Sequence, residues 1–490
     1  MKTSICLIIL MIHINLGSFA QTATLPSGAG TVSNPYQIEN LNNLYWIAAH
    51  YTRWHAHYIQ TNNIDAAATA DWFGGAGWLP IGGSPIPFDG TYDGQGHTID
   101  SISINRSDNA YHGFFATINE GTISNLKLTN LNIVGHHVGG LVGYAGSTTI
   151  TNCSTTGSIS GDATVGGLVG MINLSTYGYS HNVTECYSTA NVICTGDGLG
   201  YGPAGGLIGS IDNWGGNYTN LIVSDCWSSG NVQGYMTFGG FAGDCTTAKI
   251  ERCYSTGNVQ GVNTGGGFIG RTDDNTMIKN CYSHGNVTRI SSAPVYNHFF
   301  AGFMAYNQQS HISFCYSTGS VTYDGASNPT SKGFLGGSNN VIMMMANFYD
   351  MGTSGQSGSA YQGWYFGKTT GEMKTISTFT NETWDFIGET TNGTNDYWSL
   401  DGVSNGGYPF LSWENSCWTG SSRSSDWFAI SNWSTGAVPT SSDIVSIANV
   451  STNPTIGGST TAECAELIIA SGCSVTIQNN GTLTVSGNGN

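Results

Sequence analysis

The chain has 490 residues, of which 13 are Lys or Arg and 30 are Asp or Glu, so its formal net charge is −17. Charged residues make up only 9% of the chain, while 70 residues are Gly and 39% are hydrophobic. This composition excludes long amphipathic helices, disorder and a collagen-like chain, and it predicts a glycine-punctuated all-β protein. The acidic charge argues against nucleic acid or an anionic membrane as a partner.

Residues 1–20 have the pattern of a signal peptide. Lys2 precedes an apolar run over 5–12, and Ser18 and Ala20 put small residues at −3 and −1 of a cleavage site before Gln21. The run is too short to anchor the chain in a membrane, so no membrane insertion is expected. We therefore expect a secreted protein that is extracellular or at the cell surface.

Residues 21–110 are predicted to form an N-terminal cap and the first rungs of a repeat structure. Within them, apolar residues recur at helical spacing over 40–50, from Leu41 to Ala48. The end of a stack of strands needs a cover, because an open rung exposes unpaired backbone groups. This spacing therefore predicts a short capping helix.

A glycine motif organises residues 111–345. The pattern Gly-Gly-Leu/Phe-x-Gly and its degenerate copies recur every 27 to 39 residues, which a unit of 27 residues with insertions explains. The copies begin at His112, Gly139, Gly166, Gly205, Gly239, Gly266, Ala301 and Lys332. Short β segments separated by Gly turns at a fixed period indicate a solenoid, so we predict a parallel β-helix here.

A second motif, Cys-aromatic-Ser-Thr-Gly, follows the central copies and is usually succeeded by Asn or Ser and then Val or Ile, as in Asn258-Val259 and Ser320-Val321. Its cysteines are Cys153, Cys186, Cys226, Cys253, Cys281 and Cys315. At one register, these residues are expected to form an inward ladder of packed thiols, since a free Cys behaves as a small hydrophobe. Pairing of neighbours and metal binding are alternatives, but the C-x₂₋₄-C spacing of metal sites is absent.

The aromatic residues after these cysteines are the candidate binding site. They are Tyr187, Trp227, Tyr254, Tyr282 and Tyr316. If the cysteines point inward, strand alternation sends these rings outward as a ladder suited to the faces of sugars. The alternative is a stacked ladder inside the core.

Sparse acids lie near the repeat cysteines, namely Glu185, Asp225 and Glu251. A glycosidase needs a pair of carboxylates about 5–9.5 Å apart, and a solvated acidic corner is the commoner meaning of such a stripe. We therefore predict no catalytic residue, no metal site and no cofactor.

The end of the chain is predicted to contain two further parts. Residues 346–415 are rich in Trp and Tyr and lack the repeat, so they are expected to cap the β-helix. Alternating β runs over 416–490 predict a second, small β-solenoid-like module, in which Cys464 and Cys473 are candidates for pairing. Because the chain stops directly after a strand, this module is expected to be truncated.

The repeat pattern resembles the GLUG repeat of bacterial secreted and surface proteins, and the resemblance extends over about residues 28–415. It includes Trp78-Leu79-Pro80-Ile81-Gly82 near the start and Tyr408-Pro409-Phe410-Leu411 near the end. One departure is Phe348, which stands where the pattern tends to have Cys. The resemblance implies a right-handed parallel β-helix at a bacterial surface. The C-terminal module resembles those of secreted proteins of Bacteroidetes-type bacteria.

GLUG repeats also accompany immunoglobulin-cleaving metallopeptidases, whose zinc lies on an H-E-x-x-H domain. This run is absent from the sequence, so peptidase activity is not expected. We predict an adhesin-like, non-catalytic protein that contacts glycans or other extracellular surface molecules. The alternatives are a structural spacer of a larger surface protein and a polysaccharide-active β-helix enzyme.

Overall fold

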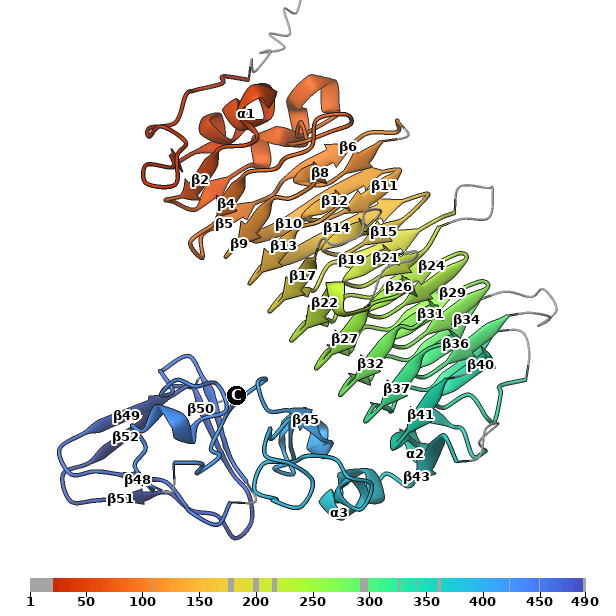
Figure 1. Ribbon diagram of the computed structural model, residues 1–490, viewed down its shortest axis with the longest axis vertical. Coiled ribbons are helices and arrows are strands. Elements are labelled where there is room, and N and C mark those ends of the chain that lie inside the picture. Colours follow the sequence, from red (N-terminus) through yellow and green to blue (C-terminus); the bar gives the residue numbers. More distant parts are fainter. Residues whose placement is uncertain are drawn as a thin grey trace, which may run out of the picture.

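The structure is a computed structural model that describes residues 21–487 except 109, 175–179, 197–201, 214–217, 291–297, 325–326, 341, 359–362, 423 and 449. The predicted signal peptide, residues 1–20, lies outside the described residues. Figure 1 shows a long stack of strands, capped by helices at its N-terminal end and followed by a smaller C-terminal part. The stack is a parallel β-helix.

Four parallel sheets form the walls of the β-helix. Sheet 1 contains β1 (Tyr36–Ile38), β2 (His57–Gln60), β4 (Thr91–Asp93), β9 (Thr122–Ser124), β13 (Thr149–Thr151), β17 (His181–Thr184), β22 (Leu221–Ser224), β27 (Lys249–Glu251), β32 (Met277–Lys279), β37 (His311–Ser313) and β41 (Met343–Met345). Sheet 2 contains β3 (Ile64–Asp65), β5 (Thr98–Asp100), β6 (Ser103–Asn105), β10 (Lys127–Gly135), β14 (Ser154–Gly161), β18 (Tyr187–Ser188), β19 (Asn191–Cys194), β23 (Trp227–Ser228), β24 (Val232–Gly234), β28 (Tyr254–Ser255), β29 (Val259–Gly261), β33 (Tyr282–Ser283), β34 (Val287–Arg289), β38 (Tyr316–Ser317), β39 (Val321–Tyr323), β42 (Asn347–Asp350) and β43 (Tyr365–Lys368).

The other two walls are shorter. Sheet 3 contains β7 (Tyr111–His112), β11 (His137–Gly139), β15 (Val165–Gly166), β20 (Ala204–Gly205), β25 (Thr237–Gly239), β30 (Thr264–Gly266) and β35 (Phe299–Ala301). Sheet 4 contains β8 (Phe115–Ile118), β12 (Val142–Ala145), β16 (Val169–Asn173), β21 (Ile208–Asp212), β26 (Ala242–Thr246), β31 (Ile269–Asp273), β36 (Met304–Gln308) and β40 (Leu335–Asn339).

The Gly-Gly pair of each repeat makes the corner between sheets 3 and 4. A Cβ added to Gly240 would lie 2.2 Å from the carbonyl oxygen of Gly267 in the next rung, and one added to Gly239 would lie 2.2 Å from the carbonyl oxygen of Ala242. Real Cβ atoms do not approach an oxygen so closely, so Gly is favoured at both positions. The second position is Gly in every copy, whereas His112, Ala301 and Lys332 stand at the first position of the degenerate copies. The glycine period in the sequence is therefore the period of the rungs.

The apolar residue after each Gly-Gly pair points into the core. Phe268 is fully buried, and its ring stacks between Phe241 at a centroid distance of 4.8 Å and Phe303 at 5.0 Å. Leu141, Leu168 and Leu207 continue this column toward the N-terminus, all of them fully buried. One column of large side chains thus runs through successive rungs.

The six repeat cysteines also lie inside the β-helix, all buried and none in a disulfide. The Cys153 N–H donates to Sγ of Cys186 at 3.4 Å, and the Cys186 N–H donates to Sγ of Cys226 at 3.3 Å. Burial raises the pKa of the Cys253 and Cys281 thiols well above the usual value. Cys253 and Cys281 are therefore protonated thiols packed inside the β-helix.

We expect these thiols to resist alkylation in the native protein, because only an accessible thiolate reacts quickly. Cys473 is partly exposed and is not in a disulfide, so iodoacetamide should modify it first. Peptide mass spectrometry before and after denaturation would measure this order. A Cys473→Ser variant is the control, and rapid labelling of Cys253 in the native protein would contradict the expectation.

The N-terminal end is covered by the predicted helix, α1 (Leu41–Ala49). The side chain of Asn40 caps it by accepting from the backbone N–H groups of Asn42 and Asn43 at 3.0 and 3.1 Å. Its buried residues include Leu44 and Ile47. The capping helix is confirmed, and the short helices η1 (Tyr51–Arg53) and η2 (Ala67–Gly75) extend the cover.

Beyond residue 345 the β-helix continues before it is capped, since β42 pairs in parallel with both β38 and β43. The register corrects the reading of Phe348. Phe348 pairs with Tyr316, so Asn347 occupies the cysteine position, and its Oδ1 accepts from the Cys315 N–H at 3.1 Å. The remaining elements of this part are α2 (Met351–Ser354), η4 (Glu372–Lys374), α3 (Ile376–Thr380), β44 (Trp398–Ser399), η5 (Ser404–Gly407) and β45 (Phe410–Leu411).

The last part of the chain is a second, smaller stack of strands. Its parallel pairs are β46–β47–β50, β48–β51 and β49–β52. Trp418, Trp427 and Trp433 pack in its core. Cys464 and Cys473 do not form a disulfide, so the candidate pairing is wrong. The elements are β46 (Ser416–Cys417), η6 (Ile430–Asn432), β47 (Ile444–Ile447), β48 (Thr455–Ile456), β49 (Thr461–Cys464), β50 (Glu466–Ile469), β51 (Thr476–Ile477) and β52 (Thr482–Val485).

Candidate functional site

The aromatic residues after the repeat cysteines form one column on the outside of sheet 2. Parallel pairing places Tyr187, Trp227, Tyr254, Tyr282 and Tyr316 at the same register in successive rungs. Their ring centroids are 4.5, 5.7, 4.8 and 5.1 Å apart, and no ring is tilted more than 8° from the next. The rings point away from the core because the preceding cysteines point into it. We call these five residues the aromatic column.

The chain returns to cover one end of this column. Residues 404–415, here called the C-terminal strap, lie over the last rungs, and Trp413 stacks on Tyr254 at 5.9 Å. The Tyr282 hydroxyl donates to Glu414 at 2.8 Å, and the Tyr316 hydroxyl donates to the Pro409 carbonyl at 2.5 Å. Tyr282 is consequently 1% exposed and Tyr316 is not exposed at all. The column is therefore partly exposed only at its other end.

The open end of the column consists of Tyr187, Trp227 and Tyr254, all partly exposed. Between it and the C-terminal strap lies a cavity of about 240 Å³. Its lining combines Trp227 and Tyr254 with polar residues that include Thr256, Asn405 and Glu414. Aromatic rings beside hydrogen-bonding groups are the components of a site for a ligand with both apolar and polar surfaces.

Glu414 has an unusual electrostatic environment in this cavity. Its carboxylate oxygens accept from the Tyr282 hydroxyl and from the Leu411 backbone N–H. Desolvation by the surrounding protein outweighs these bonds and raises the pKa of Glu414 to about 8. At neutral pH the carboxyl is therefore mostly protonated and gives the cavity a hydrogen-bond donor as well as acceptors.

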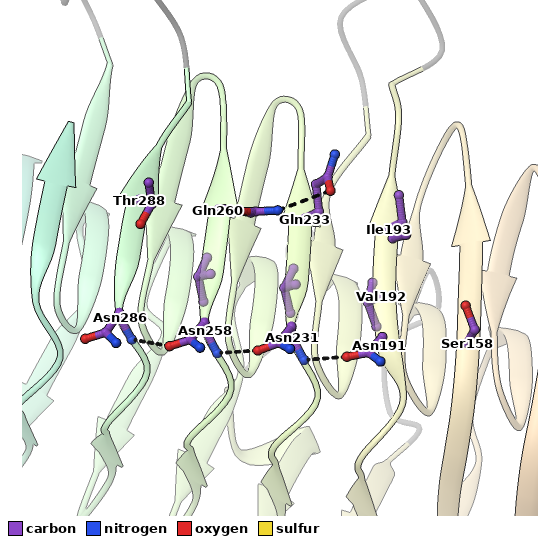
Figure 2. A pocket seen from close by; sticks show the side chains of 12 residues that line it. Ser158, Asn191, Val192, Ile193, Asn231, Gln233, Asn258, Gln260, Asn286 and Thr288 are labelled. Atoms are coloured by element: carbon purple, nitrogen blue, oxygen red, sulfur yellow. Dashed lines mark hydrogen bonds between the residues drawn. The ribbon is translucent and has the colours of Figure 1, made fainter. Parts of the chain in front are cut away.

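A column of polar side chains also follows successive rungs of sheet 2 (Figure 2). It consists of Asn191, Asn231, Asn258 and Asn286, each four residues after an aromatic ring. Each Oδ1 accepts from a backbone N–H of the next rung, at 3.1, 3.0, 3.1 and 2.9 Å in order. A groove of about 630 Å³ follows this column. We call it the asparagine groove.

The sequence pattern does not predict the asparagine groove, although it contains a signal for it. That signal is the Asn that recurs before Val or Ile in the repeat. A sequence period shows that these residues share a register, but only the geometry shows that they line a groove.

Two of the acids near the repeat cysteines, Asp225 and Glu251, contact the same guanidinium, that of Arg252. Asp225 accepts two bonds from the guanidinium of Arg252, both at 2.7 Å, and Glu251 contacts Lys249 at 2.9 Å. Glu185 lies at a turn with positive φ. The carboxylates of Asp225 and Glu251 are thus engaged by neighbouring cations.

The described residues contain neither a group of side chains arranged for a metal ion nor a helix that could cross a membrane. In that part of the chain, no group of three or more His, Cys, Asp or Glu side chains is arranged to hold a metal ion. Nor does any described helix have the length and apolarity needed to cross a membrane.

Comparisons with protein families give two matches. Residues 135–160 match the GLUG motif, and residues 417–489 match a domain of unknown function, DUF8693. The first match covers one unit of the repeat that sheets 1 to 4 continue through the stack. The second covers the smaller C-terminal stack.

Two relatives are similar over part of the chain. Halomucin of Haloquadratum walsbyi is 38% identical over 151 residues, which are 30% of this chain and 2% of halomucin. A protein of Evansella cellulosilytica described as a Gly-rich membrane protein is 36% identical over 142 residues, which are 28% of this chain and 16% of that protein. The chain thus spans only a small part of the length of these relatives.

Two solved structures are also similar. A Bacteroides ovatus protein described as an immunoglobulin A1 protease has 19% identity and a TM-score of 0.45, covering 79% of this chain and 94% of that one. A structure titled IgA1 Protease has 17% identity and a TM-score of 0.38, covering 56% of this chain and 21% of that one.

Fold and repeat together define the class, a parallel β-helix whose rungs are set by a glycine motif and a cysteine motif. Residues 135–160 of this β-helix match the GLUG motif.

Proposed function

We propose that this protein is a non-catalytic surface protein that binds glycans through the open end of the aromatic column. The observation that carries the proposal is the row of three partly exposed, stacked rings, Tyr187, Trp227 and Tyr254, beside a polar cavity. Because the rings stack face to face, they present a strip of ring edges and hydroxyl groups along the stack. The face of Tyr187 toward the rung of Ser154 has no ring of the column on it, and the C–H face of a sugar can pack there. The protonated Glu414 and the amide of Asn405 supply bonds to hydroxyl groups.

A location at the cell surface or outside the cell is the second part of the proposal. Two relatives are named halomucin and a Gly-rich membrane protein, and both names fit a protein of the cell exterior. The predicted signal peptide points the same way.

A structural spacer is the alternative, and a specific observation favours it. The C-terminal strap covers Tyr282 and Tyr316 completely, so part of the aromatic column serves packing and not binding. A spacer would use the remaining rings in the same way, with no ligand.

Binding of the full chain to an array of glycans distinguishes these functions. We expect selective binding that a Trp227→Ala variant weakens by about tenfold or more, since a central aromatic ring contributes strongly to an interface. The control is Tyr51→Ala, which removes an aromatic ring that is 56% exposed in the N-terminal cap. No binding by the native chain would favour the spacer, and equal binding by Trp227→Ala would place the site elsewhere. Cleaved glycan products would show catalysis.

A further inference from the structure

We propose that the asparagine groove binds a linear, uncharged polysaccharide that lies along the axis of the β-helix. This inference rests on the proposed glycan-binding function and names its ligand class. The groove follows four successive rungs, so its long direction is that of the stack (Figure 2). A linear polymer can therefore repeat the same contacts from rung to rung.

The hydrogen bonds of the column orient its amides. Each Oδ1 accepts from a backbone N–H of the next rung, which requires the oxygen to face the backbone. The Nδ2 groups are then left at the surface, where all four side chains are exposed. Neighbouring rungs lie about 4.8 Å apart, so the groove carries a row of amide donors at that spacing. Hydroxyl and ring oxygens of a polysaccharide accept such bonds.

A second row of side chains widens the polar floor. Gln233 and Gln260 lie two residues beyond the asparagines, and Nε2 of Gln260 donates to Oε1 of Gln233 at 3.3 Å. Thr288 and Ile193 continue this row in the rungs on either side. All the residues that line the groove are uncharged. A net charge of −17 over the whole chain further disfavours a polyanion.

The structural role of the asparagines does not by itself explain them. The bond to the backbone N–H of the next rung explains the position of each Oδ1. The same register nevertheless has Ser158 in the rung before Asn191 and Ser320 in the rung after Asn286. The β-helix thus accepts Ser at this position. Asn occupies four of the five rungs that line the groove, with Ser158 in the first, and three of these four rungs also carry the partly exposed rings Tyr187, Trp227 and Tyr254.

The two features lie within reach of one ligand. Thr256 lines the cavity beside the aromatic column, and Asn258, two residues further on, lines the asparagine groove. Rings on one side and amide donors on the other provide contacts for the faces and the edges of a sugar chain, respectively.

The test measures binding of the full chain to soluble polysaccharides by isothermal titration calorimetry. The uncharged probes are β-glucan, xylan and galactomannan, and the anionic probes are polygalacturonate and chondroitin sulfate. The first variant is Asn231→Asp with Asn258→Asp, which keeps an oxygen for the backbone N–H and replaces the outward donor by an acceptor. The second is Asn231→Ser with Asn258→Ser, which copies the residue at Ser158, and melting temperatures report whether each variant is folded.

We expect the native chain to bind at least one uncharged polysaccharide, and both double variants to bind it about tenfold or more weakly. Unchanged affinity in the folded serine variant, together with weakened binding by Trp227→Ala, would overturn this inference and leave the proposed function standing. Preference for an anionic probe would also overturn it. No binding to any glycan would overturn both.

Discussion

Raising the pH from 6.5 to 8 is expected to weaken the docking of the C-terminal strap by about 2 kcal/mol. The pKa of Glu414 is about 8 when the strap is docked, against a usual value of 4.5. Between these values the docked state holds one more proton than the undocked state, so stability falls as pH rises. The stabilisation of the docked strap by the protonated Glu414 is complete below about pH 4.5, and it is lost as pH rises through about 8.

The window above pH 6.5 separates Glu414 from other buried acids. The pKa of Asp244 and that of Asp396 are raised to about 6, so both are mainly ionised there. Desolvation lowers the pKa of His284 and that of His181 to about 4, so both stay neutral. Tyr282 donates to Glu414 and keeps its proton because burial raises its pKa.

Hydrogen exchange of the strap measures this effect. We would compare the exchange of residues 404–415 in the native chain and in Glu414→Gln at each pH, because the amide keeps the shape of a protonated carboxyl. The ratio of the two rates removes the intrinsic pH dependence of exchange. Faster exchange of the native strap above pH 8 is expected, and a ratio that does not change with pH would contradict the assignment.

The periodic parts of this molecule were open to prediction because the rung repeats in the sequence. The second Gly of each motif marks the corner between sheets 3 and 4, where only Gly fits. The repeat cysteines mark the residues whose side chains face the core. Both are local features, in which each residue depends on the rungs directly beside it. The capping helix was likewise visible in the spacing of apolar residues over 40–50.

The same pattern could not predict which rings of the aromatic column are exposed and which are buried. Tyr187 and Tyr282 each follow a repeat cysteine, yet one is partly exposed and the other is buried. The returning chain makes the difference, since Trp398 packs on Tyr282 and Glu414, 132 residues beyond it, accepts its hydroxyl bond. A contact at such a distance leaves no period in the sequence, so the closed end of the column required the structure.

The position of Phe348 shows a smaller limit of the same kind. The sequence motif places it at the cysteine, but the strand register shifts by one residue and puts Asn347 there. Asn347 replaces the thiol acceptor by an amide oxygen, which preserves the bond from the Cys315 N–H. This rung therefore keeps a hydrogen-bond acceptor at the cysteine position, although the residue type differs.

Replacing Phe268 by Ala is expected to lower the free energy of unfolding by about 3–5 kcal/mol. The ring is fully buried and stacks on a ring in each neighbouring rung. Its removal therefore leaves a cavity that touches its own rung and both neighbours. Phe268→Leu is the matched control, since Leu141, Leu168 and Leu207 fill this position in earlier rungs, and about 1.5 kcal/mol or less is expected for it. Denaturant unfolding followed by circular dichroism measures both.

The nature of the solenoid determines how this loss is distributed. Each rung contacts only its neighbours, so the defect weakens the stack locally and does not act on one global core. The rung of Phe268 also carries Tyr282 and Asn286, which belong to the closed end of the aromatic column and to the asparagine groove. We therefore expect hydrogen exchange in Phe268→Ala to rise first in β31 to β34. Uniform destabilisation of all rungs, or equal stability of the Ala and Leu variants, would contradict this nearest-neighbour view.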